Sequence, residues 1–265
     1  MLICIAGDTH GQLDRLYKEV LAFEAALGAR FAWVLHVGDV GIWPDVTRID
    51  RATRNHGDVG DFPVWWAEKR HAPRPTVFVK GNHEDFVWLD EQPSTEILPG
   101  LHYLKNGSTF VLTHAGERLV VGGVGGCYGP AHFERRSQSL QGYGRRHYTR
   151  DEIDAVTQTG PLDILLLHDA PGGVPFARAL RGGTTESQAV GLDRLLEQTH
   201  PRVCFFGHYH VRIDTLVAGV SCVGMNKVPY PGSLMAVELP KAEPTWRRVG
   251  EWPLDGGTSA PLHTP

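Results

Sequence analysis

Five apolar segments of this sequence each end abruptly in residues that can bind a metal ion. The segment from Leu2 to Ala6 runs into Gly-Asp-Thr-His-Gly, and the segment from Trp33 to Val37 runs into Gly-Asp. Three later segments run into Gly-Asn-His-Glu, His-Asp and Gly-His-Tyr-His, and they are Thr76 to Val79, Asp163 to Leu167 and Val203 to Phe206. Short apolar runs bounded by turn residues are typical of buried strands. Buried strands alternating with helices indicate an α/β fold.

The first two apolar segments are joined by a stretch with helical periodicity. Apolar residues recur at helical spacing from Leu13 to Leu21, and Gly28 supplies a helix stop. A strand, a helix and a second strand form a βαβ unit, whose two strands run parallel in one sheet. The carboxyl ends of such strands lie on the same edge of the sheet. We therefore expect the polar residues that follow the strands to meet at that edge.

Further elements are indicated in the second half of the chain. Thr149-Arg150-Asp151-Glu152 has the capping-box pattern that opens a helix, and Gly160-Pro161 closes it. A second helix is expected over residues 187–199. The stretches 110–126 and 211–239 are rich in β-forming residues and turn signals, which predicts antiparallel strands in a second sheet.

The chain length of 265 residues favours one large α/β domain, which we place at residues 1–240. From Lys241 onward Pro, Gly, Ser and Thr accumulate without periodicity, so residues 241–265 are expected to form a loosely held tail.

Charge and cysteine usage restrict the partners and the compartment. The net charge of −4 excludes a polycation that coats nucleic acid non-specifically, so any nucleic-acid site must be local. The four cysteines show no C-x-x-C spacing and are interpreted as buried, reduced thiols. The apolar run before Gly7 is too short for a signal peptide, and no run reaches membrane-spanning length. We expect a cytoplasmic protein that does not enter membranes.

The residues that follow the apolar segments form a set of candidate metal ligands. Each one alone is an ordinary strand-end residue, but together they supply carboxylate, amide and imidazole donors without a thiolate. Such donors suit Mn²⁺, and also Fe²⁺ or Zn²⁺, better than soft-metal or cluster chemistry. We call this set the ligand cluster, and it comprises Asp8, His10, Asp39, Asn82, His168, His208 and His210.

The size of the ligand cluster predicts two divalent ions. Its seven side chains give four contacts to each ion if one carboxylate bridges, and Asp39 is the expected bridge. Ions about 3.5 to 4 Å apart can hold a shared hydroxide for in-line attack. The ions also leave net positive charge in the site, so a phosphoryl group is the expected guest. His83, next to Asn82, is a candidate general acid for the departing oxygen and is not expected to bind metal.

The order of these blocks, D-x-H, G-D, G-N-H-[ED], H and G-H-x-H, resembles the calcineurin-like metallophosphoesterases over residues 7 to 210. The resemblance implies a four-layer α/β/β/α sandwich of two mixed β-sheets flanked by helices. It further implies that Asp8, His10, Asp39 and His210 hold one metal, that Asp39, Asn82, His168 and His208 hold the other, and that His83 is the catalytic histidine.

Two details narrow the resemblance. The run Val40-Gly41-Ile42-Trp43 follows Asp39 where protein serine/threonine phosphatases of the family have V-D-R-G, which disfavours that subfamily. The Gly-Asn-His-Glu-Asp block and the segments 101–104 and 121–133 are most similar to RNA lariat debranching enzymes. Those enzymes cut a 2′,5′-phosphodiester, often with cysteine at the position of Asp8. The aspartate here favours a conventional two-metal site and leaves the branched linkage open.

Residues 131–150, which we call the arginine segment, are the predicted substrate-binding region. Arginines alternate there with Phe133, Tyr143 and Tyr148, as phosphate contacts and base-stacking platforms would require. A solvated basic loop is the alternative interpretation. The candidate substrate contacts are His132, Arg135, Arg136, Arg145 and Arg146.

These observations favour a metal-dependent phosphodiesterase that hydrolyses its substrate by attack of a metal-bridging hydroxide. The expected substrate is RNA or another nucleic acid, bound as a single strand. A small-molecule phosphatase or nucleotide phosphodiesterase is the alternative. A non-catalytic scaffold that binds partners through the same fold is a third hypothesis, which the complete ligand set disfavours.

Overall fold

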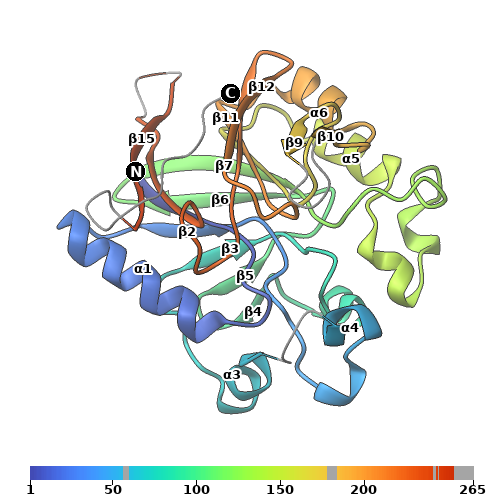
Figure 1. Ribbon diagram of the computed structural model, residues 1–265, viewed down its shortest axis with the longest axis horizontal. Coiled ribbons are helices and arrows are strands. Elements are labelled where there is room, and N and C mark those ends of the chain that lie inside the picture. The colour runs from blue at the N-terminus through green and yellow to red at the C-terminus, as the bar shows by residue number, and fades with distance from the viewer. Residues whose placement is uncertain (56–59, 178–183, 241–242, 244, 254–265) are drawn as a thin grey trace.

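The computed structural model describes residues 1–55, 60–177, 184–240, 243 and 245–253. Two mixed β-sheets pack face to face, and helices cover the outer face of each (Figure 1). This arrangement confirms the predicted four-layer α/β/β/α sandwich.

The first sheet has seven strands in the order β15-β14-β1-β2-β3-β5-β4. Its centre is parallel, as the βαβ pattern predicts, and consists of β1 (Leu2–Ala6), β2 (Trp33–His36), β3 (Thr76–Phe78) and β5 (Leu101–Tyr103). Antiparallel strands close both edges, namely β4 (Glu96–Leu98), β14 (Leu234–Glu238) and β15 (Arg247–Trp252).

The second sheet has six strands in the order β12-β13-β11-β8-β7-β6. Its parallel centre consists of β7 (Glu117–Val124), β8 (Ile164–Leu167), β11 (Val203–Phe206) and β13 (Val220–Gly224). The antiparallel edge strands are β6 (Thr109–His114) and β12 (Ile213–Val217). A separate two-stranded ribbon joins β9 (Pro175–Ala177) to β10 (Thr184–Glu186).

Helices α1 (Leu13–Leu27) and α3 (Phe62–Glu68) pack on the first sheet, whereas α5 (Arg150–Thr157) and α6 (Leu192–Thr199) pack on the second. The shorter helices and 3₁₀ turns are α2 (Arg51–Asn55), α4 (Phe86–Glu91), η1 (Val46–Arg48), η2 (Ser137–Ser139) and η3 (Gly142–Arg146). None of the helices in the described part of the chain is both long enough and apolar enough to cross a membrane.

Alternation along the strands produces three apolar layers. In β1, Ile3 and Ile5 face the second sheet, whereas Cys4 and Ala6 face α1 on the opposite side. The outer face of the second sheet packs against α5 and α6 in the same way. Each fully buried Leu or Ile contributes about 1.5–3 kcal/mol to folding. The four cysteines are all free and buried in the described structure, in agreement with their interpretation as thiols.

Most of the predicted helix boundaries are confirmed. Helix α1 ends at Gly28, which adopts the left-handed conformation, and α5 begins with a capping box between Thr149 and Glu152. The second predicted helix was expected to begin at Ser187 but begins at Leu192. The backbone N–H of Ser187 donates to the carbonyl of Val174 and its hydroxyl donates to the carbonyl of Ala170, so this stretch is held extended beside the ribbon.

The carboxyl-terminal part of the chain corrects two expectations. Strand β14, within the stretch 211–239 that predicted the second sheet, pairs instead with β1 of the first sheet. Residues 247–252, within the predicted tail, form β15 along β14. Without β15, the outer backbone N–H and C=O groups of β14 would lack partners, which explains why so polar a segment becomes a strand. Residues 241–242, 244 and 254–265 of the predicted tail lie outside the described residues.

Candidate metal centre

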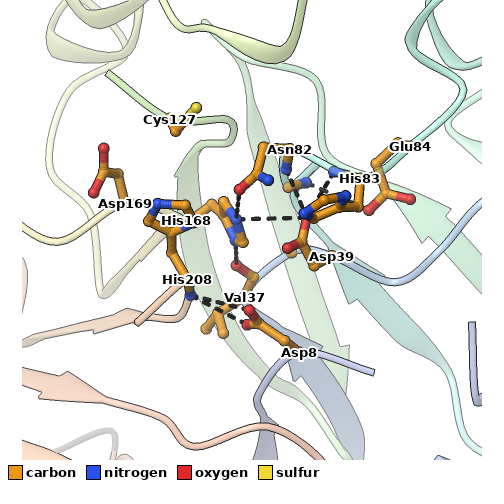
Figure 2. Close-up of polar contacts among 12 residues, drawn as sticks. Asp8, Val37, Asp39, Asn82, His83, Glu84, Cys127, His168, Asp169 and His208 are labelled. Atoms are coloured by element: carbon orange, nitrogen blue, oxygen red, sulfur yellow. Dashed lines mark hydrogen bonds and ion pairs between the residues drawn. The ribbon is translucent and has the colours of Figure 1, made fainter. Parts of the chain in front are cut away.

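The residues of the ligand cluster all come together where the carboxyl ends of the parallel strands of both sheets meet. Strands β1, β2 and β3 of the first sheet deliver Asp8, His10, Asp39 and Asn82, and strands β8 and β11 of the second deliver His168, His208 and His210. Figure 2 shows five of them, Asp8, Asp39, Asn82, His168 and His208, gathered in one place. Sequence reasoning predicted convergence at a strand edge, and the structure builds that edge from two sheets facing each other.

One group of potential metal ligands consists of Asp8, His10 and His210. Their donor atoms all lie within 4.8 Å of one another. A carboxylate oxygen of Asp8 lies 3.0 Å from Nε2 of His210, and the two Nε2 atoms of His10 and His210 are also 3.0 Å apart. Two imidazole nitrogens that face each other over a carboxylate form a site that a cation would satisfy.

A second group consists of Asp39, His168 and His208, whose donor atoms also lie within 4.8 Å of one another. The side-chain oxygen of Asn82 is 3.0 Å from Nε2 of His168 and thus adds an amide donor. Asp39 faces both groups, because its Oδ1 lies 3.5 Å from His168 and its Oδ2 lies 3.9 Å from Nε2 of His10. This placement suits the bridging role predicted for Asp39.

His83 lies close to the first group as well. Together with His10 and Asp39 it forms a third set of donors that could hold an ion. Its imidazole packs edge-on against the ring of His10, with the ring centroids 5.4 Å apart. His83 therefore lies within reach of the first group of ligands, although the sequence analysis did not count it among the metal ligands.

The backbone of the site is held in conformations that side-chain-bearing residues rarely adopt. His10, Asp39, His208 and His210 have φ values of 47°, 52°, 67° and 52°. Positive φ costs about 1–3 kcal/mol at residues other than glycine and persists only where the surroundings enforce it. Such conformations gather at functional sites, and no sequence pattern indicated them here.

Two glycines explain part of the motif spacing. A Cβ atom on Gly81 would lie 1.9 Å from Oδ1 of Asp39, and one on Gly207 would lie 2.2 Å from Oδ1 of Asp8. Both distances are far below contact distance, so a side chain at either position would displace a carboxylate. The glycines that precede Asn82 and His208 thus make room for the two acidic ligands.

Glu84 fixes the loop that carries Asp39. Its carboxylate accepts hydrogen bonds from the backbone N–H groups of Val40, Gly41 and Ile42, at 2.6 to 3.0 Å. Burial and the nearby Asp39 raise the pKa of Glu84 to about 8, although the backbone N–H groups oppose this. The carboxylate of Asp85 accepts a hydrogen bond from the backbone N–H of Trp88, which caps helix α4, and it forms an ion pair with Arg48.

The site concentrates buried charge. Asp8 and Asp39 are 0% and 1% exposed. Burial opposes ionisation of the Asp39 carboxyl, but the imidazoles of His168 and His10 outweigh it and hold the pKa of Asp39 below its usual range. Conversely, burial lowers the pKa of His10 to about 4, so its ring is neutral near pH 7. Ionised carboxylates and neutral imidazoles are the forms that bind metal ions.

His36 is a buried histidine near the centre whose two ring nitrogens already have partners within the protein. It is fully buried, its Nε2 lies 3.1 Å from the hydroxyl of Thr9, and its Nδ1 accepts from the N–H of Gly38. The donor set of the centre therefore consists of carboxylates, an amide and imidazoles. Divalent ions of the Mn²⁺, Fe²⁺ or Zn²⁺ type fit these donors, and they would offset the two buried carboxylates.

The arginine segment forms the turns η2 and η3 and reaches helix α5. Arg145 pairs with Asp90 at 2.8 Å, Arg146 lies over the ring of Tyr143, and His132 stacks on His147 with centroids 4.4 Å apart. Arg135 and Arg136 are exposed. Of the three aromatic residues that were expected to stack on bases, only Tyr143 has an exposed ring, with 43% of the residue exposed.

Phe133 and Tyr148 cannot stack on a base. They are only 3% and 0% exposed and belong to the apolar layer under α5 and α6. Beside the loop of His83, a cavity of about 270 Å³ opens between the arginine segment and helix α4. Its lining includes Trp43, Arg48, Asp50, Phe86 and Tyr143.

The sequence pattern of the calcineurin-like phosphoesterase family matches residues 1–212 of this chain. The chain therefore belongs to that family, which confirms the resemblance drawn from the motifs. The match extends from β1 to the residues just after His210, so it contains every member of the ligand cluster.

Individual relatives are more distant. The chain is 24% identical to a lariat debranching enzyme of Caenorhabditis briggsae, over 90% of this chain and 51% of that protein. It is 26% identical to lariat debranching enzyme A of Xenopus laevis, over 92% of this chain and 49% of that protein. The chain thus spans about half the length of these relatives. A solved structure of a putative 5′-nucleotidase from Staphylococcus aureus shares the fold, with a TM-score of 0.54, 14% identity, and coverage of 94% of this chain and 53% of that one.

Proposed function

We propose that this chain is a metal-dependent phosphodiesterase that hydrolyses a phosphate ester in RNA or another nucleic acid. One observation carries the proposal: donors from strands of both sheets form adjoining groups, with Asp39 facing both. Structural packing alone has no need for two buried carboxylates among imidazoles, because burying charge without compensation is costly.

Each group would hold one divalent ion. Asp8, His10 and His210 would hold the first, Asn82, His168 and His208 the second, and Asp39 would contact both. Bound ions would polarise a phosphoryl oxygen and lower the pKa of coordinated water. The protein contributes rigidity: Asp39 accepts hydrogen bonds from the backbone N–H groups of Asn82 and His83, at 2.6 and 2.9 Å, which ties two of the ligand loops together.

His83 would act as the general acid for the departing oxygen. It is 6% exposed, and its donor atom lies within 4.8 Å of those of His10 and Asp39, close to the residues that would hold the ions. The indole N–H of Trp43 donates to the backbone carbonyl of His83 at 3.2 Å and fixes the main chain beneath the ring. A positioned imidazole typically accelerates such proton transfer by about 10²–10⁴-fold.

The nucleic-acid substrate is supported by the arginine segment and by the names of the relatives. Exposed Arg135 and Arg136 are available to phosphates, and Tyr143 offers an exposed ring. The relatives are lariat debranching enzymes, so a 2′,5′-linked ester belongs among the substrates to test.

One observation favours the alternative, a small-molecule phosphatase or nucleotide phosphodiesterase. Arg145 and Arg150 pair with Asp90 and Glu134, so part of the positive charge of the arginine segment is already neutralised within the protein. A substrate with a single phosphate would need fewer basic contacts than a polymer.

Hydrolysis assays separate the two functions. The purified chain, stripped with EDTA and reloaded with Mn²⁺, is offered bis(p-nitrophenyl) phosphate, p-nitrophenyl phosphate, and linear and branched RNA oligonucleotides. We expect metal-dependent cleavage of the diester and of at least one RNA. Preference for the monoester with no cleavage of RNA or DNA would support the alternative. Equal activity with and without metal would contradict both.

A scaffold of the same fold requires a separate test. Asn82→Ala and His83→Ala would each abolish turnover in an enzyme, whereas a scaffold would bind its partner equally well with either change. Unchanged turnover in both variants would refute the proposed site.

A further inference from the structure

Thr53 places its hydroxyl against the ring of His83. Its Oγ1 lies 3.1 Å from Nδ1 of His83, and the residue is 9% exposed. Thr53 belongs to α2, in the long stretch between Asp39 and Asn82 that carries no family motif. The contact joins residues thirty positions apart in the sequence.

The stretch that carries Thr53 is fastened to the His83 loop at other points too. Trp43 donates to the carbonyl of His83, and Arg48 forms an ion pair with Asp85 at 2.8 Å. Asp50 accepts from the backbone N–H of Thr53 at 2.7 Å and so sets the position of α2. The hydroxyl of Thr53 is therefore held in register with the imidazole.

We propose that Thr53 is a positioning residue that holds the imidazole of His83 at Nδ1, so that Nε2 is the nitrogen that exchanges a proton with the substrate. The proposal rests on the proposed role of His83 as general acid. In the charged ring both nitrogens carry protons, and Nδ1–H donates to the Thr53 hydroxyl. When the ester P–O bond breaks, the Nε2 proton passes to the leaving oxygen. The neutral ring then remains as the Nδ1–H tautomer.

A hydroxyl suits this task because it can either accept or donate a hydrogen bond. It accepts from Nδ1–H in the charged ring and can keep the contact with Nδ1 in the neutral ring, so the ring need not reorient during the reaction. The arrangement follows the general logic in which a third group orients the residue that transfers the proton.

The test compares Thr53→Val, which keeps the shape and removes the hydroxyl, with Thr53→Ser, which keeps the hydroxyl. Thr47→Val is the matched control, because Thr47 lies in the same stretch but its exposed hydroxyl contacts Asp45. The Mn²⁺-loaded proteins hydrolyse two diesters of similar shape, bis(p-nitrophenyl) phosphate and diphenyl phosphate. Phenolate is the poorer leaving group and depends more on protonation.

For Thr53→Val we expect kcat on diphenyl phosphate to fall by about tenfold to a hundredfold, with KM unchanged and kcat on the p-nitrophenyl ester within about twofold of wild type. Thr53→Ser should restore most of the loss, and Thr47→Val should behave as wild type. An equal loss on both esters, or no rescue by serine, would overturn the proposal. If the wild-type chain hydrolyses neither diester with any metal, the proposed function itself has failed instead.

A measurement on the unsubstituted protein covers the case in which Thr53→Val does not fold. Nitrogen NMR of histidine-labelled, Zn²⁺-loaded protein, with His83→Gln to assign the signal, reports whether each ring nitrogen is hydrogen-bonded. We expect Nδ1 of His83 to give the signal of a hydrogen-bonded nitrogen. An Nδ1 without a hydrogen bond would refute the inference, whatever the activity.

Discussion

The ligand cluster and the arginine segment are built in opposite ways. The ligands follow directly after buried parallel strands, and backbone N–H groups hold their carboxylates, as in the bonds from Asn82 and His83 to Asp39. Several of them are held at positive φ by the surrounding structure. The main chain around the cluster therefore fixes the positions of its carboxylates.

The arginine segment relies on short 3₁₀ turns and on ion pairs at the surface. Arg150 and Glu134 pair while their side chains remain 44% and 66% exposed, and water and salt weaken pairs as exposed as this one. Little energy is needed to exchange them for contacts with a phosphate. Under the proposed function, the sheets would supply the chemistry, whereas the exposed side chains of the arginine segment would supply the choice of substrate.

The largest effect is expected at Asp39, where the two parts of the ligand cluster join. Asp39→Asn keeps the shape but removes a buried negative charge that faces both groups. We expect kcat on bis(p-nitrophenyl) phosphate to fall by at least about a thousandfold, with loss of at least one metal by calorimetric titration. Asp45→Asn, a change at an exposed turn residue, is the control. Retention of full activity and two metals would exclude Asp39 as a bridge.

Glycine substitutions compare the rigidity of the two regions directly. Gly81→Ala would place a Cβ 2.1 Å from the backbone nitrogen of Asp39, whereas at Gly144 in the arginine segment the nearest atom lies 3.7 Å away. We expect Gly81→Ala to lower the free energy of unfolding by about 2 kcal/mol or more and Gly144→Ala by less than about 0.5 kcal/mol. Urea denaturation measures both. Comparable losses would show that the arginine segment is as rigid as the ligand cluster.

The same contrast explains what the sequence could reveal. Ligand residues are predictable because β-strand periodicity, glycine and the following polar residue stand together in the chain, as in Gly81-Asn82-His83. The parallel edge then brings them together without any need to know tertiary detail. Helix α1 and the capping box of α5 were predictable for the same reason, since their signals are local.

Contacts between residues that are far apart in the sequence leave no local pattern from which they could be predicted. Thr53 and Glu84 act on residues thirty and more positions away, and neither residue type is unusual in its place. The aromatic residues of the arginine segment were misjudged because burial of Phe133 and Tyr148 depends on α6, which begins roughly forty-five to sixty positions later in the chain. Strand β15 was missed because the backbone of β14, and no apolar pattern of its own, holds it in the sheet.

The arginine segment itself is tested by removing its two exposed charges. For Arg135→Ala/Arg136→Ala we expect KM for an RNA oligonucleotide to rise about tenfold and its salt dependence to weaken, with kcat on bis(p-nitrophenyl) phosphate unchanged. Arg30→Ala/Arg118→Ala removes two exposed arginines near the amino ends of β2 and β7, on the far side from the ligand cluster. If both double variants weaken RNA cleavage equally, the effect is one of net charge and the arginine segment has no special role.

The smallest effect is expected where the arginine segment is anchored to the sandwich. The hydroxyl of Thr149 lies 2.6 Å from a carboxylate oxygen of Asp151. The backbone N–H of Thr149 donates to the carboxylate of Glu152 at 3.0 Å. Thr149→Ala removes the side-chain part of this cap and should lower the free energy of unfolding by about 1 kcal/mol, while Thr159→Ala at the other end of α5 should cost less. Thermal unfolding and kinetics on both substrates follow the change. Because the ligand cluster lies on other elements, hydrolysis of bis(p-nitrophenyl) phosphate should persist even if RNA binding weakens. Loss of both activities together would mean that the arginine segment and the ligand cluster form one cooperative unit.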